Sequence, residues 1–299
     1  MPPPTTVPAL RALLDAHGLR PKKSLGQNFL ISESLLQSIV RAADMDPDDV
    51  VIEVGPGVGT LTYQLALTAR RVVAVELDQH MVAILRDTLA SCGNVTVLHQ
   101  DILRLDIADA IAQIPTNQPT NQPPTSNLQL PASTLQYKVV ANLPYYITSA
   151  VIRKFLDSPH PPNVLVLMVQ HEVAQRIMAA PGDMSLLAVS VQFYAQPSLV
   201  MKLPAGAFYP APQVDSAVVR LDVRAERPAV DVERFFRVAH AGFGQKRKQL
   251  RNSLAAGLGL SGAESEAWLR RADIDPQRRA QTLTIAEWVR LTQGWSGEN

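Results

Sequence analysis

Short apolar runs alternate with helical patterns over the first 170 residues, and this alternation limits the fold more than any other feature of the sequence. The expected strands cover 50–54, 71–75, 95–99, 137–141 and 164–169, and the expected helices cover 9–17, 32–43, 61–69, 81–90 and 147–156. Runs that are apolar on both faces and separated by helices are typical of a parallel sheet with helices on both sides. The expected fold class is therefore α/β, Rossmann-like.

The pattern changes after Arg224, where only helical segments are expected. These cover 232–241, 246–256, 264–271 and 285–292, and turns containing Gly or Pro join them. We therefore expect two domains, a sheet-containing domain at 1–224 and a small all-helical domain at 225–299. Residues 114–136 hold five prolines and no charge, and they predict a disordered insertion in the first domain.

Several classes of protein are disfavoured by what the sequence lacks. Cys92 is a lone cysteine, so it cannot form an internal disulfide, and the six histidines do not have the spacing of a zinc site. The apolar runs are too short to cross a bilayer, and no charged leader precedes an apolar stretch. We expect a cytoplasmic protein without a structural metal and without a membrane partner.

A glycine-rich turn, EVGPGVGT at 53–60, follows the first expected strand. Glycines allow close approach of a ligand, and the amides of the following helix point at the turn. The third glycine falls one position earlier than in the dinucleotide-binding fingerprint. Glu76 and Asp101 end the next two strands, and a carboxylate about twenty residues after such a turn can hold a ribose diol. Together these strand ends predict an adenosine-containing cofactor at the carboxyl edge of the sheet.

The segment NLPYY at 142–146 follows the fourth expected strand and faces the same crevice. Taken alone, it is more typical of a proline turn with aromatic packing. Beside a cofactor it has a particular chemistry, because the exocyclic amine of adenine is a poor nucleophile whose lone pair is delocalised into the ring. Asn142 Oδ1 and a neighbouring backbone carbonyl can accept both N–H bonds and localise that lone pair, while Tyr145 stacks on the ring. This chemistry needs no strong general base.

Eight motifs in order make the chain resemble the small-subunit (16S) ribosomal RNA adenine N6-dimethyltransferases. They read KKSLGQNFL (22–30), IEVGPGVGTLT (52–62), AVELD (74–78), QDIL (100–103), NLPYYITS (142–149), MVQHEVAQRI (168–177), FYPAPQVDSAVVRL (208–221) and FGQKRKQLRNSL (243–254). The resemblance implies a class I methyltransferase fold with a helical C-terminal domain, and S-adenosylmethionine as cofactor. It also implies that the chain dimethylates two adjacent adenosines in a hairpin near the 3′ end of small-subunit rRNA, within a pre-30S particle during ribosome biogenesis, and we expect it to do so as a monomer.

The resemblance implies roles for individual residues. Asn28 and Leu30 would close over the cofactor beside Gly55, Glu76 would hold its ribose, and Asp101 its adenine amine. The full set of expected cofactor-binding residues is Asn28, Leu30, Gly55, Gly57, Glu76, Asp101 and Asn142. The expected catalytic residues are Asn142, Leu143, Pro144, Tyr145 and Phe208. Phe208 would supply a second aromatic wall around a flipped base, against the alternative of core packing.

A basic cluster, Lys246, Arg247, Lys248 and Arg251, lies in the second half of the chain. From charge alone a solvated helix face is the simpler interpretation. With a structured RNA partner, a phosphate-binding edge becomes equally plausible, because such a partner needs cationic contacts near the cleft. We therefore expect these four residues to bind RNA.

Three alternatives stay open on the sequence alone. The large-subunit (23S) rRNA adenine methyltransferases that confer macrolide resistance share the fold and chemistry, but usually carry isoleucine in place of Leu143. DNA adenine methyltransferases tend to have an acidic residue in place of Asn142. The third alternative is a ribosome-assembly factor that acts mainly by binding and uses methylation as a checkpoint.

Overall fold

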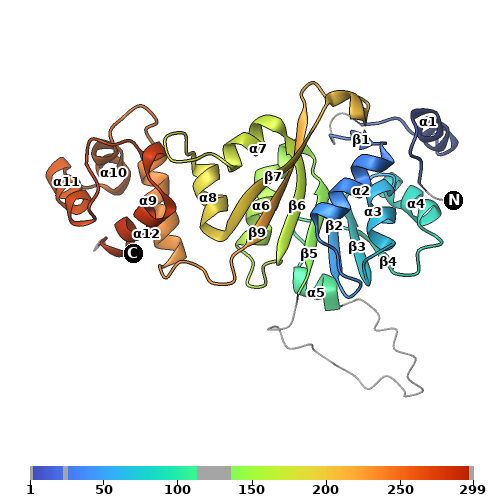
Figure 1. Ribbon diagram of the computed structural model, residues 1–299, viewed down its shortest axis with the longest axis horizontal. Coiled ribbons are helices and arrows are strands. Elements are labelled where there is room, and N and C mark those ends of the chain that lie inside the picture. The colour runs from blue at the N-terminus through green and yellow to red at the C-terminus, as the bar shows by residue number, and fades with distance from the viewer. Residues whose placement is uncertain (1–2, 23–25, 113–135, 296–299) are drawn as a thin grey trace, which may run out of the picture. The chain divides into compact units, whose positions relative to one another are not determined.

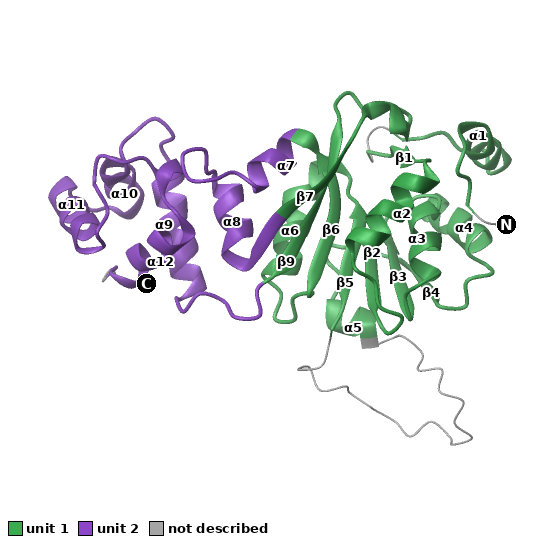
Figure 2. Ribbon diagram, viewed as in Figure 1, with its two compact units in different colours: residues 1–171, 198–223 green, residues 172–197, 224–299 purple. Residues whose placement is uncertain are grey.

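The computed structural model describes residues 3–22, 26–112 and 136–295 (Figure 1). Except for Gln136, the insertion expected at 114–136 lies outside these residues. The chain divides into two compact units, coloured separately in Figure 2. The first comprises residues 1–171 and 198–223, and the second comprises residues 172–197 and 224–299.

A seven-stranded sheet forms the first unit's centre, with strand order β4-β3-β2-β5-β6-β9-β7. The strands are β2 (Val50–Val54), β3 (Arg71–Glu76), β4 (Val95–His99), β5 (Lys138–Asn142), β6 (Val164–Gln170), β7 (Ala195–Leu203) and β9 (Ser216–Val223). Strands β4, β3, β2, β5 and β6 are parallel, whereas β9 pairs antiparallel with β6. The expected mostly parallel sheet is confirmed. Strands β7 and β9 are additions that the sequence analysis did not assign.

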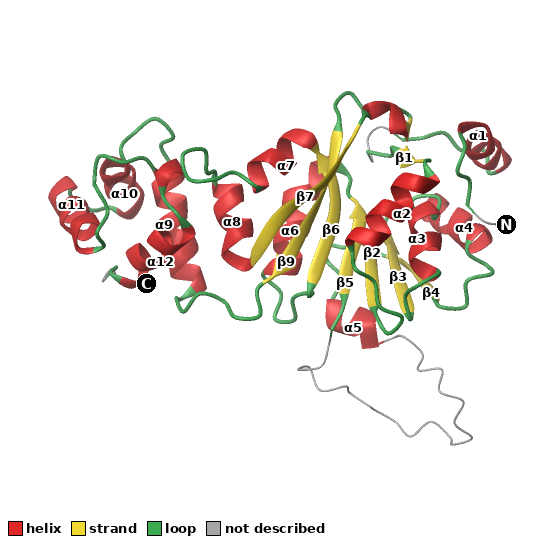
Figure 3. Cartoon of the chain, viewed as in Figure 1, coloured by secondary structure: helices red, strands yellow, loops and turns green. Residues whose placement is uncertain are grey.

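Helices flank this sheet (Figure 3). The helices of the first unit are α1 (Val7–Ala16), α2 (Glu33–Ala42), α3 (Thr60–Ala66), α4 (Gln79–Thr88), α5 (Ile107–Ala112) and α6 (Thr148–Leu156). Every residue of β2 is buried, as are the central residues of β5. This burial explains why, apart from Glu53, the buried positions of these two strands are Val, Ile and Ala without polar alternation.

A second, two-stranded sheet joins the N-terminal segment to a distant part of the chain. Strand β1 (Phe29–Leu30) pairs antiparallel with β8 (Phe208–Tyr209), with Leu30 opposite Phe208. The Tyr209 hydroxyl accepts a hydrogen bond from Arg11 Nε at 3.0 Å, and the Arg11 guanidinium lies over the Tyr209 ring. These contacts fix the segment that carries Asn28 and Leu30.

The second unit is helical. Its helices are α7 (His171–Ile177), α8 (Leu186–Tyr194), α9 (Val232–Phe243), α10 (Leu250–Leu258), α11 (Gly262–Arg271) and α12 (Ile285–Gln293). The structure moves residues 172–197 out of the expected first domain, because α8 packs against α9: the Phe193 and Phe235 ring centroids are 4.2 Å apart. The helix expected at 246–256 begins only at Leu250, so Lys246, Arg247 and Lys248 precede it.

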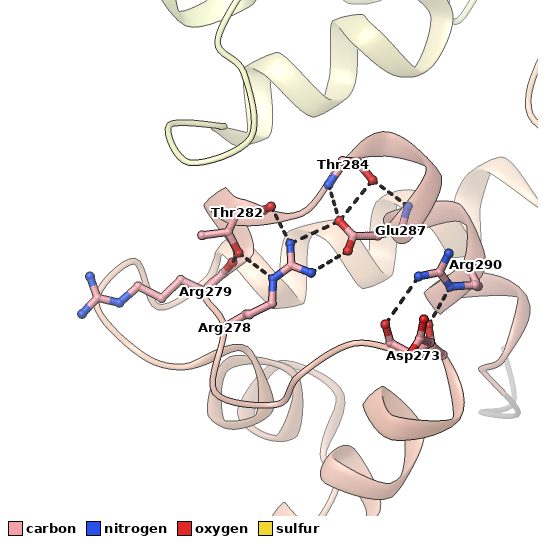
Figure 4. A network of polar contacts seen from close by, with 8 residues as sticks. Asp273, Arg278, Arg279, Thr282, Thr284, Glu287 and Arg290 are labelled. Atoms are coloured by element: carbon pink, nitrogen blue, oxygen red, sulfur yellow. Dashed lines mark hydrogen bonds and ion pairs between the residues drawn. The ribbon is translucent and has the colours of Figure 1, made fainter.

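An ion-pair network fixes the connection between α11 and α12 (Figure 4). The Arg278 guanidinium bonds to both carboxylate oxygens of Glu287, and its Nη2 donates to the Thr282 carbonyl at 2.6 Å. Thr284 caps α12 in a capping box with Glu287. The Leu250 amide donates to the Arg278 carbonyl at 2.7 Å, so the same network holds the start of α10.

Candidate active site at the carboxyl edge of the sheet

A cavity of about 310 Å³ lies at the carboxyl ends of β2, β3 and β5. Every expected cofactor-binding residue lines it: Asn28, Leu30, Gly55, Gly57, Glu76, Asp101 and Asn142. Pro144 and Tyr146 also line it, together with the exposed apolar side chains of Leu77 and Leu103. The structure thus brings together residues that the sequence separates by more than a hundred positions.

The glycine turn after β2 has a backbone that only glycine adopts easily. Gly55, Gly57 and Gly59 all have positive φ angles, of 67°, 59° and 88°. The Gly55 amide donates to the Val75 carbonyl at 3.0 Å, which ties the turn to the end of β3. A Cβ on Gly57 would lie 2.9 Å from Cε1 of Phe29. The turn is therefore pressed against the N-terminal segment with no space for a side chain.

The Gly57→Ala variant is expected to lose more than about 1 kcal/mol of unfolding free energy, because a left-handed backbone is costly for L residues. The clash with Phe29 adds to this cost. Denaturant unfolding of the two proteins measures the difference. Gly93→Ala is the matched control, since a Cβ there meets no atom within 4 Å and Gly93 is not left-handed. Equal stability of both variants would contradict the description of the turn.

Glu76 is buried at the tip of β3 and joins two backbone segments. Its Oε1 accepts from the Asp78 amide at 2.8 Å, and its Oε2 accepts from the Gly57 amide at 3.3 Å. Burial raises the pKa of Glu76, while these amides favour the charged form and oppose the rise. The carboxylate therefore holds the glycine turn in place and presents its remaining lone pairs to the cavity.

Glu53 also lines the cavity, and the sequence analysis gave it no separate role. Its side chain is 1% exposed, and Oε2 has no hydrogen-bond partner among the described residues. Burial, with a smaller contribution from the Glu76 charge, raises the pKa of Glu53 to about 8. A cationic group entering the cavity would favour the ionised form of this carboxyl.

The raised pKa of Glu53 predicts how stability changes with pH. Because the folded pKa of about 8 exceeds the ordinary value of 4.5, the folded state binds an extra proton between these values. The contribution of Glu53 to stability is therefore complete below pH 4.5 and is lost as the pH rises towards 8. We expect the difference in unfolding free energy between Glu53→Gln and wild type to grow in favour of the variant over this range. A constant difference, measured by denaturant unfolding at several pH values, would show that Glu53 ionises normally.

Asp101 lies past the end of β4, where its Oδ1 accepts from the Leu103 amide at 2.9 Å. This bond is a local turn that orients the side chain, whose Oδ2 lies 3.9 Å from Nε of the exposed Arg104. Leu77 and Leu103 are both exposed, and both line the cavity. Two apolar side chains beside an acidic acceptor form a surface that suits a flat heterocycle with an amine.

A buried carboxylate that sequence reasoning missed anchors the N-terminal segment. Asp78 Oδ2 accepts from Lys22 Nζ at 2.9 Å and from Gln27 Nε2 at 3.3 Å, and Oδ1 accepts from the His80 amide at 3.0 Å, capping α4. Burial acts to raise the pKa of Asp78, but these donors outweigh it and lower the pKa. Its place in the AVELD motif beside Glu76 was the signal available in the sequence.

Asn142 ends β5 with its amide oriented by the backbone of the N-terminal segment. Its Nδ2 donates to the Asn28 carbonyl at 3.0 Å, which leaves Oδ1 as an acceptor. The Leu143 side chain is buried, so this residue can act at the site only through its backbone. The Pro144 carbonyl already accepts from the Ile147 amide. Leu143 itself does not line the cavity, so a catalytic role for its carbonyl stays a prediction.

The aromatic residues differ from expectation. Tyr145 is half-buried, does not line the cavity, and its hydroxyl lies 2.7 Å from Ser216 Oγ. Tyr146 is 60% exposed and lines the cavity. Phe208, expected as an exposed wall, is only 4% exposed and belongs to the hydrophobic core cluster that contains Leu30 and Leu36. Its pairing with β1 draws the ring into this core, so its stacking role stays a prediction.

The basic cluster in the second unit is divided by the structure. Lys246, Arg247 and Lys248 are exposed and precede α10. Arg251 instead pairs with Glu266 at 3.1 Å, and its exposed fraction is 40%. The structure therefore gives Arg251 an ion-pair partner, and the expectation that all four residues bind RNA stays a prediction. Arg279, exposed next to the network of Figure 4, is another cation that the sequence analysis did not single out.

Neither a metal-binding cluster nor a membrane-spanning helix is found in the part of the chain that the structure describes. No cluster of three or more His, Cys, Asp or Glu side chains there could hold a metal ion. No described helix has the length and apolar character needed to span a bilayer.

The parallel sheet, the glycine turn and the acidic strand tips around one cavity define a class I methyltransferase. Residues 18–294 match the family described as ribosomal RNA adenine dimethylase. The chain belongs to this family.

Relatives of known name cover nearly the whole chain. The ribosomal RNA small subunit methyltransferase A of Dehalococcoides mccartyi strain 195 is 44% identical over 290 residues, which are 96% of this chain and 93% of that protein. The protein of the same name from Alkaliphilus metalliredigens is 42% identical over 289 residues, covering 95% of this chain and 94% of that protein.

Two solved structures share the fold. The 23S rRNA methyltransferase ErmE is 27% identical, with a TM-score of 0.67 over 89% of this chain and 99% of that one. A dimethyladenosine transferase from Plasmodium falciparum is 22% identical, with a TM-score of 0.69 over 87% of this chain and 94% of that one. The second supports the fold alone.

Proposed function

We propose that this chain transfers methyl groups from S-adenosylmethionine to N6 of two adjacent adenosines near the 3′ end of small-subunit (16S) rRNA. The observation that carries the proposal is the single cavity where the glycine turn, Glu76 and Asp101 meet Asn142, whose Oδ1 is left as an acceptor. The names of the relatives point to small-subunit ribosomal RNA as the substrate. The finer proposals are that the chain acts on a pre-30S particle, in the cytoplasm and as a monomer.

The cavity residues fit the cofactor. Glu76 presents carboxylate lone pairs suited to ribose hydroxyls, and Asp101 with Leu77 and Leu103 suits an adenine ring. Glu53, buried and with an unpartnered oxygen, suits a cationic group. When bound, the cofactor supplies an electrophilic methyl group. Glu76, Asp101 and Glu53 would orient it so that this group faces Asn142.

Asn142 and Leu143 act on the target base. Asn142 Oδ1 and the Leu143 carbonyl accept the two N–H bonds of the adenine amine and direct its lone pair at the methyl group. Their attraction strengthens as positive charge develops on nitrogen, so it lowers the barrier rather than only binding the base. The methylated amine then loses its proton readily, so no basic side chain is needed.

The large-subunit RNA activity is not favoured. The relatives at 41–44% identity carry the small-subunit name, whereas ErmE is 27% identical. An assembly factor that acts mainly by binding is not favoured either, because every expected cofactor-binding residue lines the cavity. The test is mass spectrometry of 16S and 23S rRNA from a strain lacking the modification, after treatment with the protein and isotope-labelled cofactor. Dimethyladenosine in the 16S hairpin supports the proposal, and label in 23S rRNA alone contradicts it.

We further propose that Lys246, Arg247 and Lys248 contact RNA phosphates. All three are exposed in the segment before α10, so they can reach phosphates without breaking an ion pair that the structure records. Replacing them together by alanine is expected to reduce the salt dependence of RNA binding, by roughly 2 to 3 in the slope of log K against log salt. Filter binding or fluorescence anisotropy at several salt concentrations measures this slope.

The matched control removes three exposed cations from the first unit, Arg41, Arg70 and Arg86. These lie away from the cavity lining, so their replacement is expected to leave the slope close to that of wild type. Equal slopes for the two triple variants would assign Lys246, Arg247 and Lys248 to a merely solvated surface.

A further inference from the structure

Tyr145 and Ser216 form a hydrogen bond that crosses the end of a strand. The Tyr145 hydroxyl lies 2.7 Å from Ser216 Oγ. Tyr145 follows β5 and Ser216 opens β9, whereas β6 lies between these two strands in the sheet. The Tyr145 side chain therefore extends over the carboxyl end of β6, beside the cavity that Asn142 and Met168 line.

Ser216 is held rigidly at this position. It is 0% exposed and pairs in register with Gln170, the last residue of β6. The next residue outward, Asp215, continues the ladder, because its carbonyl accepts from the His171 amide at 3.0 Å. The Asp215 carboxylate also accepts from the Ala205 amide at 2.9 Å. The Ser216 hydroxyl therefore has a fixed position, and the Tyr145 hydroxyl that bonds to it is held at that position.

Tyr145, in contrast, lies on a short turn outside the sheet. It opens the 3₁₀ turn η3 (Tyr145–Ile147) directly after Pro144, and it is half-buried. The hydroxyl oxygen of tyrosine lies on the rotation axis of the ring, so fixing this oxygen sets the direction of the side chain from the backbone and the place of the ring. Burial raises the pKa of Tyr145, which keeps the hydroxyl neutral and able to donate to Ser216.

We propose that Ser216 is a positioning residue that holds the Tyr145 ring at the carboxyl end of β6, where it can stack on the target adenine. This inference rests on the proposed function. The stacking role falls to Tyr145, which is half-buried, and not to Tyr146, which is exposed. The bond ties the ring of a turn residue to a strand of the sheet, so the stacking surface exists before RNA binds and loses little entropy on binding.

The test is a double-mutant cycle with Ser216→Ala, Tyr145→Phe and the combined variant. Each single change removes one hydroxyl of the bond and keeps the aromatic ring, so each is expected to lower kcat about threefold to tenfold. Because both changes break the same bond, the combined variant is expected to be no slower than the slower single variant. Cofactor affinity, measured by calorimetry, is expected to change less than twofold in all three.

Tyr137→Phe is the matched control. Tyr137 lies beside the opposite end of β5, and its buried hydroxyl donates to the His160 carbonyl at 2.9 Å. Its loss is expected to lower the melting temperature, as the loss of a buried hydroxyl bond should, but to leave kcat unchanged. This control separates an effect on the position of the Tyr145 ring from a general effect on stability.

The outcomes are distinct. A wild-type kcat in Ser216→Ala, or multiplicative losses in the combined variant, overturns the inference while the proposed function stands. A kcat loss matched by Tyr137→Phe assigns Ser216 to stability alone and also overturns it. If wild-type protein forms no dimethyladenosine on small-subunit RNA, the proposed function fails, and the inference fails with it.

Discussion

Replacing Asn142 by alanine is expected to reduce the rate of methyl transfer by about 100-fold to 1,000-fold, the loss typical of one preorganised polar group aimed at developing charge. The variant loses the Oδ1 acceptor for the amine, so the lone pair stays delocalised in the adenine ring. Single-turnover incorporation of labelled methyl into small-subunit RNA measures the loss. The affinity for the cofactor, measured separately by calorimetry, is expected to fall far less than the rate.

Two further variants sharpen this prediction. Asn142→Asp keeps an acceptor but loses the donor that bonds to the Asn28 carbonyl at 3.0 Å, and it places a carboxylate against that carbonyl. It is therefore expected to be impaired as well. Asn163→Ala, which removes an exposed amide beside the opposite end of β6, is the control and is expected to retain full activity. A fully active Asn142→Asp would contradict the described orientation of the amide.

Replacing Glu76 by alanine is expected to weaken cofactor binding by about 10-fold to 150-fold, which corresponds to about 1.5–3 kcal/mol for a charged hydrogen-bond acceptor. The variant loses the acceptor for the ribose. It also releases the Gly57 and Asp78 amides, which Glu76 holds at 3.3 and 2.8 Å. Titration calorimetry with S-adenosylhomocysteine measures the affinity without turnover.

Glu76→Gln keeps the size of the side chain but turns an NH₂ group towards one of these two amides. The affinity of this variant for S-adenosylhomocysteine is therefore expected to fall below that of wild type, although the glutamine side chain occupies the same space. The control is Glu226→Ala, because Glu226 is exposed and does not line the cavity. An unchanged affinity of Glu76→Ala for S-adenosylhomocysteine would show that Glu76 does not bind the cofactor.

The sheet and its ligand edge could be predicted from the sequence because their signals are local. Strands β2 to β6 are apolar runs that end in glycine, acidic or amide residues, and parallel order places those ends at one edge. For this reason Gly55, Glu76, Asp101 and Asn142 were expected together and do line one cavity. The glycines of the turn carry the same kind of local signal, since their positive φ angles require them.

The remaining features depend on contacts between distant segments, which no local pattern encodes. Residues 172–197 belong to the second unit because Phe193 packs on Phe235. Arg251 is paired because α11 brings Glu266 beside it. Phe208 is in the core because two residues of β8 pair with β1. In each case a partner far along the chain decides the environment of a side chain, which is why the sequence analysis did not foresee it.

The most direct test of the account is a crystal structure of the chain bound to S-adenosylhomocysteine and a short hairpin of small-subunit RNA. The account predicts an adenine turned out of its helix, with N6 within hydrogen-bonding distance of Asn142 Oδ1 and the Leu143 carbonyl, and the ribose of the bound nucleoside on Glu76. An adenine amine bound away from the end of β5, or a nucleoside outside the cavity beside the glycine turn, would contradict it.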